Sequence, residues 1–277
     1  MSQISIIFQK NEKPLFLSFW NKFERDISGF YNICIGNTEE TIDLNFEIKD
    51  RKCDLIKARL CKDLMESAVL FYKEQYFDLH IGEGFSSKIE RQALIRALAV
   101  FDKAYDINYA LKNMSIDEKI NIRSYFQFRL AEIKLRWQEI AGLFQENLAY
   151  LLASDSCVEL IRNLIEITEN DIESVFVNSF ENYIFIRDKN GVELCPPISV
   201  LSSEFLDEVV LQIIPLAPKS IYLAENKDRY LGLENKLRYI FDKKVVVNAW
   251  QIGVKVVKFD CILINPFETR LLDTGRR

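Results

Sequence analysis

Few residues of this chain are of the types that carry out catalysis. His80 is the only histidine, and with Glu83 close by it could act as a general base. A single histidine beside a turn is far more often structural or exposed, so we predict no catalytic role for it. The glycine-rich phosphate loops, the G-x-S-x-G nucleophile motif and the H-E-x-x-H zinc motif do not occur in the sequence. We therefore expect no catalytic residues and no bound cofactor.

The acidic and sulfur-containing residues also lack the spacing of a metal site. Four carboxylates gather where a helix is expected to give way to a strand: Glu166, Glu169, Asp171 and Glu173. The segment has no glycine of the kind that calcium-binding loops need, so a solvated junction is the better interpretation. The six cysteines are scattered without a C-x-x-C pair: Cys34, Cys53, Cys61, Cys157, Cys195 and Cys261. We expect free thiols and no metal.

Basic residues beside aromatic ones indicate contacts with another part of the protein or another molecule. They lie in one stretch: Arg123, Arg129, Lys134 and Arg136, with Tyr125, Phe126 and Phe128. Such a mixture can clamp a nucleic acid. However, acidic residues are interleaved, and the net charge of -5 with a pI near 5.3 argues against general nucleic-acid binding. Arg129 is instead the best candidate for a structural or partner contact, with Arg123 and Arg136 as further candidates, because an arginine stem can cover apolar surface while its guanidinium pairs with a carboxylate.

These arginines lie on a predicted long α-helix from Ile120 to Ala153. Its apolar residues recur every three or four positions: Phe126, Leu130, Ile133, Trp137, Ile140, Phe144, Leu148 and Leu151. Ser115 and Glu118 have the spacing of a capping box at its start. Gly142 costs about 1 kcal/mol relative to alanine in a helix, and a close helix crossing is the simplest reason to have it there. The pattern predicts a core helix with one solvated side.

The residues before this helix predict a small module followed by further helices. Strands are expected over Ile4–Phe8, Tyr31–Ile35 and Thr41–Ile48, and a helix from Leu15 that stops near Gly29. Alternation places Ile42, Leu44, Phe46 and Ile48 on one face, and this strand should pair with the one before it. Helices follow over Cys53–Phe77 and Ile89–Leu111, with a turn or short edge strand over Phe77–Gly84.

The residues after the long helix predict a second β-containing module. Cys157–Ile167 is expected to be a helix, and Val175–Val177 and Tyr183–Ile186 strands. Asp188–Gly191 is a hairpin turn signal that Val192–Leu194 should close. A helix over Glu204–Ile214, capped by Ser202 or Ser203, precedes a strand at Ser220–Leu223, a helix at Asp228–Phe241 and a strand at Lys244–Val247. The last two strands could form a parallel βαβ unit, and Val254–Ile264 one more strand.

Together these elements predict an α+β protein with a helical layer between two small β-containing modules. We place an α+β module at residues 1–50, a helical region at 51–168, a C-terminal α/β module at 169–248 and a tail at 249–277. The N-terminus has no basic segment followed by a long apolar one, so we expect no secretory signal. No apolar run approaches the ~18 residues that a membrane span needs. We therefore expect a cytoplasmic protein.

The central stretch also resembles a known family. The segments NIRSYFQFRL, AEIKLRWQEI and LQIIPLAPKSIYLAEN, the first with an aromatic-x-FRL element and the last with an "APK" turn before a strand, are similar to the YtxC-like family of sporulation proteins from endospore-forming Firmicutes. The resemblance covers roughly residues 120–247 and ends after Asn248. It implies a cytoplasmic protein connected with sporulation, and it brings no known activity and no catalytic residues.

Three functions follow as expectations that can be distinguished. The leading one is a non-enzymatic, sporulation-associated protein that acts by binding an unknown protein partner, which should leave an exposed apolar patch. A nucleic-acid-associated regulator should instead show a positive patch around Arg123, Arg129 and Arg136. An enzyme of unrecognised type should show a deep pocket that gathers polar residues from separate segments, for example Arg129 with a carboxylate.

Overall fold

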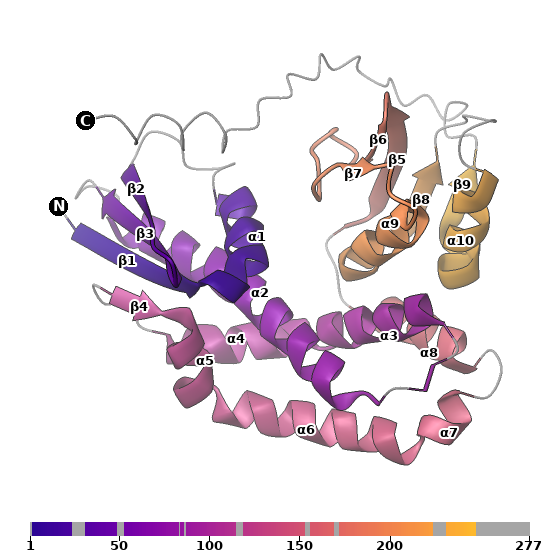
Figure 1. The fold of residues 1–277 in the computed structure, drawn as a ribbon, viewed down its shortest axis with the longest axis horizontal. Coiled ribbons are helices and arrows are strands. Elements are labelled where there is room, and N and C mark those ends of the chain that lie inside the picture. Colours follow the sequence, from indigo (N-terminus) through magenta and orange to yellow (C-terminus); the bar gives the residue numbers. More distant parts are fainter. Residues whose placement is uncertain are drawn as a thin grey trace.

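The computed structural model describes residues 2–23, 31–48, 53–82, 84–85, 87–114, 119–152, 156–168, 172–223 and 231–247. Two mixed sheets lie at opposite ends of a layer of helices (Figure 1), which confirms the α+β class. The predicted strand at Val254–Ile264, the helix stop at Gly29 and the capping box at Ser115 and Glu118 lie outside the described residues.

The N-terminal sheet has the strand order β2-β3-β1-β4. Its strands are β1 (Ser2–Gln9), β2 (Tyr31–Asn37), β3 (Thr41–Ile48) and β4 (Lys119–Asn121). β3 pairs antiparallel with both β1 and β2, and its alternate residues are buried as predicted. A 3-10 turn (η1, Lys10–Glu12) leads into α1 (Lys13–Phe23). Five buried phenylalanine rings pack α1 on the sheet in edge-to-face, tilted or stacked pairs: Phe8, Phe16, Phe19, Phe23 and Phe46.

The predicted single helix over Ile120–Ala153 is wrong in its continuity. Residue 120 belongs to β4, where Ile120 pairs parallel with Ile6 of β1, and three helices follow: α5 (Ile122–Arg129), α6 (Ala131–Glu146) and α7 (Leu148–Leu151). The Asn121 side chain caps α5 by accepting the Ser124 N–H at 3.0 Å. Leu130, at the break between α5 and α6, is buried. The apolar spacing therefore continues across the break, and the sequence pattern gives no sign of it.

The apolar face of that stretch was predicted correctly, but the reason given for Gly142 was wrong. Five of the eight apolar residues are buried (Phe126, Leu130, Ile133, Trp137 and Leu151), and the others are half-buried. A Cβ added at Gly142 would meet nothing within 4 Å. No helix therefore crosses closely over this glycine in the described part of the chain.

The helical layer contains α2 (Cys53–His80), α3 (Lys88–Val100), α4 (Lys103–Asn113) and α8 (Ser156–Ile167). The prediction of a turn or strand from Phe77 was wrong as far as His80, because α2 continues to that residue. The predicted helix over Ile89–Leu111 is in fact two helices, which separate at Phe101 and Asp102, where Asp102 has a φ of 55°. This break frees the Phe101 carbonyl, which accepts a hydrogen bond from the Lys73 ammonium at 2.5 Å.

The C-terminal sheet has the strand order β7-β6-β5-β8-β9. Its strands are β5 (Ser174–Phe180), β6 (Tyr183–Arg187), β7 (Ile198–Ser199), β8 (Ser220–Leu223) and β9 (Val245–Val247). Its helices are α9 (Phe205–Ile213) and α10 (Leu231–Phe241), followed by the 3-10 turns η3 (Ile214–Leu216) and η4 (Asp242–Lys244) respectively. β8 and β9 are parallel, which confirms the predicted βαβ unit.

The predicted turn at Asp188–Gly191 is present, with the Gly191 N–H donating to the Asp188 carbonyl at 3.1 Å. It is closed by a single bridge between Arg187 and Glu193, where we expected a full strand. In Figure 1, α9 and α10 lie between the C-terminal sheet and the helices α3 and α8. Buried apolar side chains of both sheets and of the helical layer belong to one continuous core.

Candidate functional site

The three predicted arginines occupy two different environments. Arg123 and Arg129 are exposed on α5, and within the described residues no ion pair involves the Arg129 side chain. Arg136 is half-buried on α6, where its guanidinium pairs with the Asp102 carboxylate. The same guanidinium lies 3.6 Å from the centre of the Tyr105 ring. The fold therefore brings Arg136 to the start of α4 and leaves the other two arginines facing solvent.

Arg136 belongs to a buried charged cluster that the sequence analysis missed. Lys73 and Asp106 are 1% and 2% exposed, and the Lys73 Nζ lies 2.7 Å from the Asp106 Oδ2. The Trp137 indole N–H donates to the same carboxylate oxygen at 3.1 Å. The Arg136 guanidinium lies 3.8 Å from its other oxygen. This cluster, Lys73–Asp106–Arg136–Trp137, joins α2, α4 and α6 by polar contacts inside an apolar core.

A sequence signal for this cluster was available. Lys73 falls four residues after Val69 and four before Phe77, and both of these apolar residues are fully buried. A lysine at such a position on a helix needs a buried counter-charge. Burial lowers the pKa of Lys73, and the nearby Asp106 carboxylate opposes that shift. Because its contacts join three helices inside the core, we assign the cluster a structural role.

Four large apolar residues of α5, α6 and α7 are exposed to water. Phe128 is 79% exposed, Leu135 60%, Leu143 62% and Tyr150 70%. We call these four residues, with the exposed Arg129 between the first two, the outer face of α5–α7. Single exposed apolar residues are common on protein surfaces, and exposed apolar residues that form one contiguous patch are typical of a binding surface.

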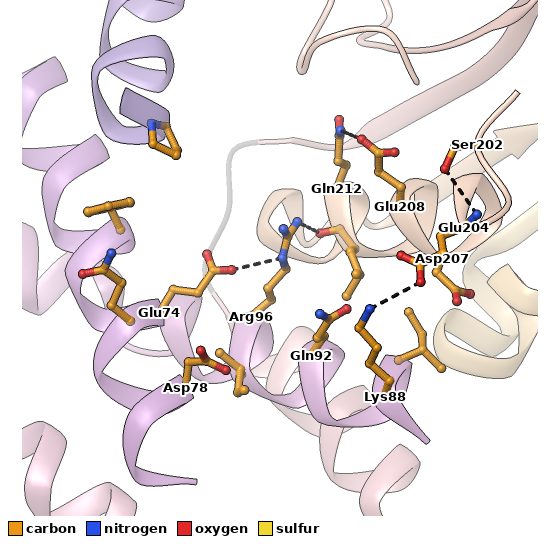
Figure 2. Close-up of a pocket in the computed structure, with 16 residues that line it drawn as sticks. Glu74, Asp78, Lys88, Gln92, Arg96, Ser202, Glu204, Asp207, Glu208 and Gln212 are labelled. Carbon is orange, nitrogen blue, oxygen red and sulfur yellow. Dashed lines mark hydrogen bonds and ion pairs between the residues drawn. The ribbon is translucent and has the colours of Figure 1, made fainter. Parts of the chain in front are cut away.

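A groove between α2, α3 and α9 gathers polar residues from separate segments (Figure 2). Its volume is about 550 Å³, and two ion pairs join residues of its lining. Arg96 of α3 lies 3.3 Å from Glu74 of α2 and donates to the Leu211 carbonyl of α9 at 2.6 Å. Lys88 lies 3.3 Å from Glu204. These pairs hold α9 against α2 and α3, and the described residues that line the groove include no histidine or cysteine. We therefore interpret the groove as a packing contact between helices.

The remaining residues considered for chemistry are dispersed. His80 is exposed, stacks on Tyr76 with ring centres 4.0 Å apart, and has its Nδ1 2.7 Å from the Tyr76 carbonyl oxygen. Its predicted neighbour Glu83, like Glu169 and Asp171, lies outside the described residues. Within the described ranges, no three His, Cys, Asp or Glu side chains form a group that could hold a metal ion. No helix in the same ranges is long and apolar enough to cross a membrane.

Comparison with known proteins adds no identification. No family model matches the chain, and no curated protein or solved structure matches it.

Proposed function

We propose that this protein acts by binding another protein through the outer face of α5–α7, in the cytoplasm of sporulating cells and without catalysing a reaction. The exposure of Phe128, Leu135, Leu143 and Tyr150 on consecutive helices is the observation that carries the proposal. Burying four such side chains against a partner contributes about 1.5–3 kcal/mol for each one that is fully covered. The setting in sporulation rests on the resemblance of residues 120–247 to the YtxC-like family.

The contacts that hold α5 and α6 in place support this proposal. The Lys73–Asp106–Arg136–Trp137 cluster fixes the inner side of α6 to α2 and α4. Asn121 fixes the start of α5. A rigid helical face needs little ordering on binding, so more of the contact energy appears as affinity. Arg129, exposed between Phe128 and Leu135, supplies a place for a carboxylate of the partner.

The test is capture from sporulating cells, with the partner identified and the complex rebuilt from purified components. We expect the purified complex to weaken at least tenfold for Leu135→Ser combined with Leu143→Ser, and less for Arg129→Ala, because the apolar contacts dominate. The matched control is Leu201→Ser, which removes a 79% exposed leucine from another surface and should leave binding unchanged.

Three results would refute the proposal. One is a partner that binds the double variant as tightly as it binds the wild type. A second is recovery of nucleic acid in place of protein, with binding that falls steeply as salt is raised. The third is that the wild-type protein captures no partner from sporulating cells.

A further inference from the structure

Strand β2 differs from the other edge strands of this fold. It is the first strand in the order of the N-terminal sheet and forms one edge of that sheet (Figure 1), and within the described residues it pairs only with β3. It is seven residues long, whereas the strands at the other three sheet edges, β4, β7 and β9, have three, two and three residues. Proteins protect their sheet edges by keeping edge strands short or by placing charges or proline in them. The length of β2 gives no such protection.

The sequence of β2 gives no protection either. Ile27–Thr38 contains no Lys, Arg, Asp, Glu or Pro, and the charged residues that flank this segment, Asp26 and Glu39, are eight and five positions from Cys34. The side chains of Asn32 and Cys34, near the middle of the strand, are exposed. An edge of this length without charge or proline is a template on which another strand can pair.

The apolar layer beneath α1 extends to this edge. Ile33 of β2 pairs with Phe46 of β3, whose side chain is fully buried. Ile35 pairs with the fully buried Leu44. Both isoleucines therefore lie on the face of the sheet that packs against α1. Ile33 is half-buried and Ile35 is 39% exposed, so the layer ends at β2 with apolar surface in contact with water.

The order of residues in β2 allows it to pair with a second copy of itself. In an antiparallel pair whose two-fold axis passes through Cys34, Ile33 of each copy faces Ile35 of the other, and Asn32 faces Gly36. No charge faces a like charge across the axis, and the isoleucines cover each other. Because a two-fold interface uses the same edge of both copies, the assembly closes at two chains.

Charges on neighbouring parts of the sheet do not oppose this pairing. Asp43 and Glu47 of β3 lie on the other face of the sheet, and in the pair Asp43 of one copy is in the same row as Glu47 of the other. They are three strand spacings of about 4.8 Å apart, and at that distance ordinary salt screens their repulsion. The Lys10 ammonium donates to the Asn37 side chain at one end of β2, so the two copies of Lys10 lie at opposite ends of the joined strands.

From these features we propose that the protein forms a homodimer in which β2 pairs antiparallel with β2 of a second copy. The two N-terminal sheets join into one continuous sheet, and α1 of each copy covers the same face of it. Backbone hydrogen bonds between the two edges and the burial of the isoleucines stabilise the dimer. One strand from each copy supplies the contact, so the interface is small and the dimer is reversible.

The first experiment is sedimentation velocity of the full chain over a range of concentrations, with a reductant present. The test variant is Asn32→Lys with Cys34→Lys, which places two lysines at exposed positions of the edge. The matched control is Gln3→Lys with Asn45→Lys, which adds the same charge at exposed positions of β1 and β3, on the same face of the sheet. Far-UV circular dichroism of both variants checks that they fold.

We expect the wild type to change from monomer to dimer as its concentration rises. The test variant should weaken the dimer by at least about tenfold, because like charges placed opposite each other across an interface are strongly unfavourable. The control should stay within about twofold, since its lysines are separated from those of the other copy by several strands and are screened.

The second experiment tests the register by disulfide formation under mild oxidation. Residues that face each other in an antiparallel pair have Cα atoms about 4.5–5.5 Å apart, which a disulfide can span. Wild-type chains should therefore be linked through Cys34, an exposed free thiol. In a Cys34→Ser background, Asn32→Cys mixed with Gly36→Cys should also be linked, while Asn32→Cys alone should not, because its two copies are about 13 Å apart. A Cβ at Gly36 makes only an ordinary contact, 3.5 Å from the Asp43 Cβ.

Three results would overturn the proposal. One is a monomer at all concentrations, and another is equal weakening of the dimer in the test and control variants. The third is a disulfide between Cys34 and Cys261 of the same chain, which would assign the edge to the predicted strand Val254–Ile264. The outer face of α5–α7 is unchanged in all these variants, so the outcome is independent of the proposed protein interaction.

Discussion

The buried pair of Lys73 and Asp106 allows the sharpest test of how this fold is held together. Both side chains are almost completely buried and 2.7 Å apart. In the wild type the Trp137 indole nitrogen lies 3.1 Å from an oxygen of the Asp106 carboxylate. In Asp106→Asn the carboxylate is lost, but the amide oxygen that replaces it can still accept the Trp137 N–H. The change therefore removes the counter-charge of Lys73 and the 3.8 Å contact of Asp106 with the Arg136 guanidinium, which keeps its ion pair with Asp102. Leaving a buried charge unpaired costs about 3–5 kcal/mol.

The partner variant should cost less. In Lys73→Met the Asp106 carboxylate keeps the Trp137 N–H and the Arg136 guanidinium 3.8 Å away, so it is not left alone. The Phe101 carbonyl loses its donor, which costs about 1–3 kcal/mol. The double variant Lys73→Met with Asp106→Asn contains no unpaired charge. We expect its loss to be smaller than that of Asp106→Asn alone, so the coupling energy should exceed the Lys73→Met loss and be at least about 1 kcal/mol.

The dependence on pH adds an independent readout. Burial holds the pKa of Lys73 below its ordinary value of 10.5, and removal of Asp106 takes away the group that opposes this shift. The unfolded chain then binds the Lys73 proton more tightly than the folded chain does, so stability rises with pH in the window below 10.5. Asp106→Asn should therefore regain part of its lost stability between neutral and alkaline pH. Lys73→Met has no such proton and should show no such gain.

The assay is urea unfolding followed by far-UV circular dichroism, with the slope against urea checked for constancy between variants. Lys62→Met is the matched control, because Lys62 is 58% exposed and its ion pair with Glu66 is long, at 3.9 Å. This variant should change the free energy of unfolding by less than about 0.5 kcal/mol. The reasoning fails if Asp106→Asn costs under about 1 kcal/mol, or if the double variant loses the sum of the two single losses.

Three further predictions concern single residues. Asn121→Ala removes the cap of α5 and should cost about 1 kcal/mol in urea unfolding, while Asn113→Ala should have little effect. Gly142→Ala should stabilise the protein by up to about 1 kcal/mol, since a Cβ there meets nothing within 4 Å. A loss of stability in this variant would instead support a close helix crossing at Gly142. Burial raises the pKa of Cys157 from 9.0 to about 11, so stability from its neutral thiol is present below pH 9 and lost as pH rises through 11. Cys157→Ala should flatten that decline, and in peptide mapping of the wild type at pH 8 iodoacetamide should modify the exposed Cys34 but not Cys157.

The sequence alone determined most of the local structure, because each of those elements is specified by nearby residues. Thr41–Ile48 alternates strictly, and alternate residues of β3 are buried. The helix after Pro14, the strand before and after α10, and the helix at Cys157–Ile167 follow from the same short-range patterns. The spacing of Phe126, Ile133 and Trp137 correctly predicted the buried side of α5 and α6. It did not reveal that the segment is divided into separate helices.

Only the tertiary structure decided where helices break and which charges meet. Ile120 is a strand residue because β1 offers it a parallel partner 114 positions earlier at Ile6, and no local pattern reports that neighbour. At the break between α3 and α4, the Phe101 carbonyl accepts a hydrogen bond from Lys73 and the Asp102 carboxylate pairs with Arg136. Lys73 and Arg136 come from other helices. Charge convergence of this kind depends on long-range packing, so spacing along the chain cannot reveal it.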